Sequence, residues 1–151
     1  MAFAFFLSRS YTAYLKRRVR EGECFLSLTE RIESMISCYL SPIKDIFSGF
    51  ECEESAVMDF VRRVRDGARL RDAYFEAEGG LAVGREGKKI LAELFSTLGC
   101  GYKDGSVGLV ASARAEFEKY LGGEREECEK NSRLAAALLL GGALGILLLL
   151  I

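Results

Sequence analysis

The stretch YTAYLKRRVREGECFLSLTERIESMISCYL, residues 11–40, decides the fold, because its apolar side chains recur at helical spacing. Steps of three and four residues place such side chains on one face of an α-helix. The stripe consists of Tyr11, Tyr14, Phe25, Leu28, Ile32, Met35 and Tyr39, with Ile36 and Leu40 beside it and a polar gap at Arg18 and Glu21. We predict a helix from Arg9 or Ser10 to Leu40, roughly 45 Å long, that forms the backbone of a bundle.

Downstream of this helix, breaks and further apolar stripes predict five more helices. Ser41-Pro42 ends the first one, because proline disfavours helix at the residue before it. The predicted segments are Pro42–Phe47, Ala56–Asp66 with Ser55 as its cap, Ala68–Ala77, Arg85–Leu98, and a last helix that begins at Asp104 or Ser106 and runs past Cys128. Gly122-Gly123 is a weak point in the last helix, since glycine costs about 1 kcal/mol relative to alanine there. No run alternates with period two, so we predict an all-α fold of about six helices without a sheet.

The sequence ends in an uncharged apolar run, LAAALLLGGALGILLLLI, from Leu134 to Ile151. As a helix this run spans about 27 Å, close to the ~30 Å hydrocarbon core of a bilayer. We therefore predict a C-terminal transmembrane helix at 134–151, preceded by a soluble helical bundle at 11–133. Residues 1–10 form a short apolar N-terminal segment, and one interpretation of it is the remnant of a membrane anchor.

Charges next to the apolar run predict how the chain is oriented. Arg125, Lys130 and Arg133 precede the run and no basic residue follows it. Basic residues stay on the cytoplasmic side of a membrane span. We therefore expect the soluble domain at the cell membrane, on the cytoplasmic side.

Small residues within the apolar run are spaced by four, at Ala137, Gly141 and Gly145. This small-xxx-small spacing allows two membrane helices to approach closely. One interpretation is a homo- or hetero-oligomer formed through the membrane helix. The other is a glycine-containing anchor without a specific partner.

Composition excludes several kinds of chemistry. Histidine is absent, which excludes a His base in a catalytic triad and His-ligated metals. The five cysteines lie far apart, which favours free thiols over a zinc site or a disulfide framework. Gly87-Lys88 fails as a phosphate loop, because Ala82 stands where the first glycine is required. The net charge of −1 gives no field that favours nucleic acid. We predict no enzyme, no catalytic, metal or cofactor-binding residue, and no nucleic-acid partner.

A string of arginines is one of the concentrated charges in the sequence. Arg62, Arg63, Arg65 and Arg69, continued by Arg71, give the third and fourth predicted helices a basic surface. Such a surface can dock an acidic partner or anionic lipid headgroups. The alternative is a solvated helix face.

At several places the chain resembles the stage III sporulation protein AB family. Leu94–Gly99, followed by Asp104, resembles the FxxxLG…D stretch of that family. Glu129–Leu134, then Leu140-Gly141 and the aliphatic tail, resembles its EKN-x-(K/R) motif and Leu-rich terminal span. Ile36–Ile43 is similar to a segment in which a helix ends at Thr/Ser-Pro-Leu.

The likeness covers roughly Arg17 to Ile151, and it implies a role in endospore formation. Members usually begin with a transmembrane helix of their own, whereas here only Ala2–Leu7 is apolar. The resemblance implies a membrane-anchored, non-catalytic subunit of a secretion-like channel between mother cell and forespore. It also implies a bundle similar to the cytoplasmic domain of type II secretion platform proteins. A cytosolic secretion-type ATPase and the other channel subunits are the implied partners.

Two other functions stay open from the residues alone. One is a tail-anchored helical adaptor or regulator unrelated to sporulation. The other is a membrane-tethered enzyme with an unrecognised site. Neither alternative changes the predicted fold.

Overall fold

The computed structural model describes the backbone of residues 2–39, 42–98 and 106–149, and the side chains of residues 10–37, 42–98 and 106–137. Over these residues the chain forms six helices and no strand, so the all-α prediction is confirmed. The helices are α1 (Ala2–Tyr39), α2 (Ile43–Ser48), α3 (Ser55–Arg65), α4 (Leu70–Glu78), α5 (Arg85–Leu98) and α6 (Ser106–Leu149).

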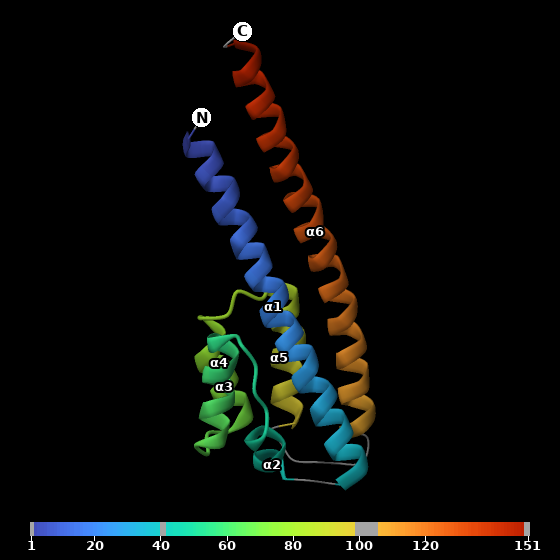
Figure 1. The fold of residues 1–151 in the computed structure, drawn as a ribbon. Coiled ribbons are helices and arrows are strands. Elements are labelled where there is room, and N and C mark those ends of the chain that lie inside the picture. Colours follow the sequence, from blue (N-terminus) through green and yellow to red (C-terminus); the bar gives the residue numbers. More distant parts are fainter. Residues whose placement is uncertain (1, 40–41, 99–105, 150–151) are drawn as a thin grey trace.

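The two long helices, α1 and α6, lie side by side and run in opposite directions (Figure 1). The start of α1 and the end of α6 therefore lie at the same end of an elongated molecule. The four shorter helices gather beside the half of this pair that is far from that end. The bundle thus has a core end, and an end from which α1 and α6 extend beyond the other helices.

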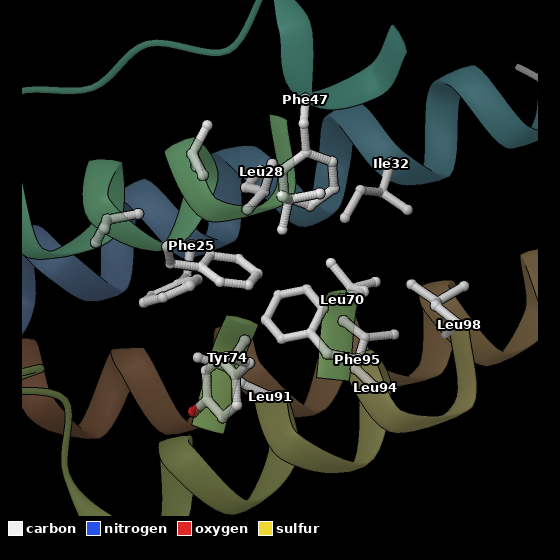
Figure 2. Packing of buried hydrophobic residues seen from close by; sticks show 14 of the residues in the cluster. Phe25, Leu28, Ile32, Phe47, Leu70, Tyr74, Leu91, Leu94, Phe95 and Leu98 are labelled. Carbon is white, nitrogen blue, oxygen red and sulfur yellow. The ribbon is translucent and has the colours of Figure 1, made fainter. Parts of the chain in front are cut away.

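Five aromatic rings at the core end form what we call the aromatic cluster: Phe25, Phe47, Phe60, Tyr74 and Phe95. The ring of Phe60 lies between the others, with centroids 4.9 Å from Phe95 and 6.0 Å from Phe25. Figure 2 shows how leucines and isoleucines from α1, α4 and α5 surround these rings. Since each large ring buries about 150–250 Å², this cluster joins α1 to α5 mainly by apolar burial.

The end of α3 is defined by a glycine. Gly67 has φ +101°, a left-handed conformation that side chains other than glycine rarely adopt. The amide of Ala68 donates to the carbonyl of Arg63, and the amide of Gly67 donates to that of Val64. These two bonds form a Schellman motif, so the predicted role of Gly67 as the stop of this helix is confirmed.

Several boundaries differ from prediction. α1 begins at Ala2, before the predicted Arg9 or Ser10, because residues 2–9 contain neither glycine nor proline to end the helix. Pro42 caps α2 from outside in an extended conformation (ψ 145°), so that helix runs one residue later than predicted. Glu54 takes the N-cap position of α3, which makes Ser55 its first helical residue.

The apolar stripe of α1 also differs from prediction at its N-terminal part. Tyr11 and Tyr14 are each 48% exposed, whereas Leu15 is buried. Their hydroxyls reach polar partners, Glu127 for Tyr11 and the carbonyl of Ala82 for Tyr14. The two tyrosines have the spacing of an apolar stripe, but their hydroxyl groups need polar partners, and these partners lie at the edge of the bundle.

α6 is continuous through Gly122-Gly123, the predicted weak point. Within the part of the chain whose side chains are described, no helix combines the length and apolarity needed to cross a membrane. Most of the transmembrane helix predicted at 134–151 lies outside those residues.

Candidate interaction surfaces

Three of the predicted docking arginines are exposed, and we call them the arginine surface: Arg62, Arg63 and Arg69. Arg62 pairs with Asp59 at 3.0 Å, and Arg63 pairs with Glu76 on α4. Exposed pairs of this kind contribute about 0–1 kcal/mol, so a partner can exchange them at little cost. Arg71, the next basic residue, lies over the ring of Phe75, 5.7 Å from its centroid.

Arg65, the fourth predicted docking residue, points elsewhere. Its Nε donates to the carbonyl of Phe47 at 2.9 Å, and its Nη2 donates to the carbonyl of Phe50. These carbonyls lie in the last turn of α2 and just after the helix, where helix geometry leaves carbonyls free to accept further bonds. Arg65 therefore ties α3 to the turn after α2.

A second site, the polar cluster, lies where α1 and α6 meet the α4–α5 loop (residues 79–84). Its members are Arg17, Arg18, Glu21, Tyr120 and Glu124. Glu21 is completely buried. Its carboxylate accepts a hydrogen bond from Arg17 at 2.8 Å and a second one from the backbone amide of Ala82. The polar gap at Arg18 and Glu21 was the sequence signal for this cluster, and sequence reasoning assigned it no role.

The α6 side of the polar cluster combines an ion pair with a buried hydroxyl. Arg18 pairs with Glu124, which is also buried. The hydroxyl of Tyr120 accepts a hydrogen bond from the amide of Gly84 at 2.8 Å. Burial raises the pKa of Tyr120, although hydrogen bonds from Arg18 and Gly84 act in the opposite direction. The phenol therefore stays neutral at neutral pH and holds the loop against α6.

The described residues contain no group of three or more Cys, Asp or Glu side chains that could hold a metal. The cysteines with described side chains, Cys24, Cys52 and Cys128, are free thiols. Burial, followed by a hydrogen bond with the Cys52 thiol, raises the pKa of Cys24 to about 12. A thiol with such a pKa is protonated at neutral pH and is a poor nucleophile.

The predicted packing stripe of the membrane helix falls mostly outside the described side chains. Ala137 is exposed at the end of the described part. Gly141 and Gly145 lie beyond it, and they remain predictions.

The described residues define an all-α helical bundle protein. A family model described as stage III sporulation protein AB matches residues 1–151. The chain therefore belongs to the stage III sporulation protein AB family, which confirms the resemblance seen at 94–104 and 129–151. No curated protein and no solved structure was found to match the chain.

Proposed function

We propose that this protein is a membrane-anchored, non-catalytic structural subunit of the sporulation channel, the secretion-like apparatus between mother cell and forespore. The observation that carries the proposal is the family match over residues 1–151. On this proposal, the bundle is the counterpart of the cytoplasmic domain of a type II secretion platform protein. The apolar run at 134–151 is then its transmembrane helix.

The shape of the molecule supports this arrangement. The start of α1 and the end of α6 lie together, while α3 and α4 lie in the half of the bundle away from them (Figure 1). A membrane anchor at the C-terminal end therefore leaves the arginine surface directed toward the mother-cell cytoplasm. A cytosolic secretion-type ATPase, or another channel subunit with an acidic face, is the partner we propose for it.

Inside the membrane we propose a second contact through Ala137, Gly141 and Gly145. Small residues at this spacing permit close helix approach, which suits association with a second copy or with another channel subunit. This contact lies within the membrane and the arginine surface lies outside it, so the two can be tested separately.

The test is co-purification of the detergent-solubilised full chain with the ATPase from sporulating cells. Arg62→Glu, Arg63→Glu and Arg69→Glu together should abolish recovery of the ATPase without unfolding the domain. Arg65 is left intact, because its bonds to Phe47 and Phe50 are internal. A matched variant reverses three exposed charges elsewhere, Lys16→Glu, Arg85→Glu and Lys89→Glu, and should leave recovery unchanged.

Two results would contradict the proposal. Recovery of no channel component with the unsubstituted protein would count against the channel role itself. Equal recovery with the arginine variant and the unsubstituted protein would return Arg62, Arg63 and Arg69 to the interpretation of a solvated helix face.

A further inference from the structure

A groove between α5 and α6 opens on a face that the proposed function does not use. Its volume is about 600 Å³. The buried side chains of Ile90 and Leu94 line it from α5, and Ala113 lines it from α6. Phe75 and Leu109, which are 48% and 37% exposed, stand at its edges. Apolar surface is therefore left uncovered along the joint of two helices.

A second hollow lies next to this one along α6. Glu116 lines both hollows, and the wall of the second, which has a volume of about 350 Å³, includes Glu86 and Gly123. From Leu109 to Gly123 the two hollows, which we treat together as the groove, follow about four turns of α6, roughly 21 Å at the helical rise. At Gly123 nothing lies within 4 Å of where a Cβ would be, so another backbone can come close.

The charges that line the groove are mostly negative. They are Glu86, Glu93, Glu116 and Glu124, with Lys119 as the one cation. Glu124 is neutralised by Arg18, and Glu93 faces Lys89 at 3.9 Å. Glu86 and Glu116 form no ion pair with any residue that the structure describes. The groove thus combines apolar surface with two carboxylates that lack a cation.

We propose that this groove binds an amphipathic helix of a partner protein, with an apolar stripe over Phe75, Leu109 and Ala113 and Lys or Arg side chains against Glu86 and Glu116. A groove of this length accepts about four helical turns. Leu109 and Ala113 lie one turn apart on α6, so one apolar stripe can cover both. The unpaired carboxylates select a basic rather than an acidic helix, because like charges across an interface are unfavourable.

A second copy of this chain is a poor occupant. The most basic of its short helices is α3, but the apolar stripe of α3 is already buried in the core. Docking α3 would require it to leave its own bundle. An anionic lipid surface is disfavoured by the glutamates of the groove. The occupant is therefore a helix that exposes both basic and apolar residues.

The test uses the full chain in nanodiscs of zwitterionic phosphatidylcholine. The probe is a fluorescent helical peptide of about four turns, with Leu and Ala on one face and Lys on the other. A matched peptide carries Glu in place of Lys, and empty nanodiscs measure binding to lipid. We expect saturable anisotropy with the Lys peptide, and affinity at least about tenfold weaker for the Glu peptide.

Paired substitutions on α6 locate the binding surface. Glu116→Lys and Leu109→Asp alter the groove and should weaken binding of the Lys peptide about tenfold or more. Glu118→Lys and Val107→Asp are the controls on the same helix, outside the groove, and should change it less than about twofold. Val107 is 39% exposed, which matches Leu109. The circular dichroism of each of the four variants, compared with that of the unsubstituted protein, shows whether the variant is folded.

Three results would overturn the proposal. One is the absence of saturable binding of the Lys peptide, and another is equal affinity for the two peptides. The third is an equal loss in groove and control variants. Self-association of the full chain that Glu116→Lys abolishes would instead identify a second copy as the occupant. The titration needs no channel component, so its failure leaves the proposed function standing.

Discussion

Two side chains one turn apart on α1 are buried completely, but by different means. Phe25 packs in the aromatic cluster, and Glu21, one turn earlier, lies in the polar cluster. Apolar contact is not directional, so other apolar side chains of similar volume could also fill the aromatic cluster. The bonds of Glu21 require one position of the α4–α5 loop, because its carboxylate must meet the amide of Ala82. We infer that the first region supplies most of the stability and the second sets how the long helices are aligned.

The largest expected effect comes from removing the ring at the centre of the aromatic cluster. Phe60→Ala should lower the free energy of unfolding by about 3–5 kcal/mol, because it loses apolar burial and leaves a cavity. Thermal unfolding of the full chain in mild detergent, followed by circular dichroism, measures the change. Phe75→Ala is the control, since that ring is half exposed. Equal losses in the two variants would contradict the assigned core.

A smaller loss is expected in the polar cluster. Glu21→Ala leaves the buried amide of Ala82 without an acceptor, which should cost about 1–3 kcal/mol. Glu23→Ala removes an exposed pair with Arg125 and should cost less than about 1 kcal/mol. The same unfolding assay compares them. If Glu21→Ala were as mild as its control, the polar cluster would not align the helices.

Replacing each of two glycines by alanine should change the free energy of unfolding in opposite directions. A Cβ on Gly87 would lie 2.8 Å from Val83 Cγ1 and 2.8 Å from Tyr120 Cζ, so Gly87→Ala should destabilise by about 1–3 kcal/mol. Gly123→Ala meets no atom and should stabilise α6 by up to about 1 kcal/mol. Unfolding of both variants under identical conditions gives the sign. Stabilisation by both substitutions would show that α5 and α6 are not closely packed at Tyr120.

Much of the fold could be predicted from local patterns. α5 has the predicted bounds, and the other helices depart mainly at their ends. The end of α3 followed from one glycine, because a left-handed residue is a local requirement. The arginine surface was likewise visible as a cluster of charge in the sequence.

The sequence could not show which of the neighbouring arginines is exposed and which binds inside the bundle. Arg63 and Arg65 are two positions apart, yet one is exposed and the other binds carbonyls at the end of α2. Which of them meets α2 depends on the angle at which α2 and α3 pack, and no short-range pattern encodes that angle. The same holds for Glu21, whose amide partner is 61 positions away.

By itself, the sequence of this protein determined the helical class, most of the helix positions and the family, because all three depend on residue order or on spacing along one helix. The tertiary structure alone decided that a polar gap becomes a buried cluster, that Arg65 is internal, and that α5 and α6 leave an acidic, apolar groove. The reason is physical: helical periodicity repeats within a few residues, whereas burial and pairing depend on which distant segments come together.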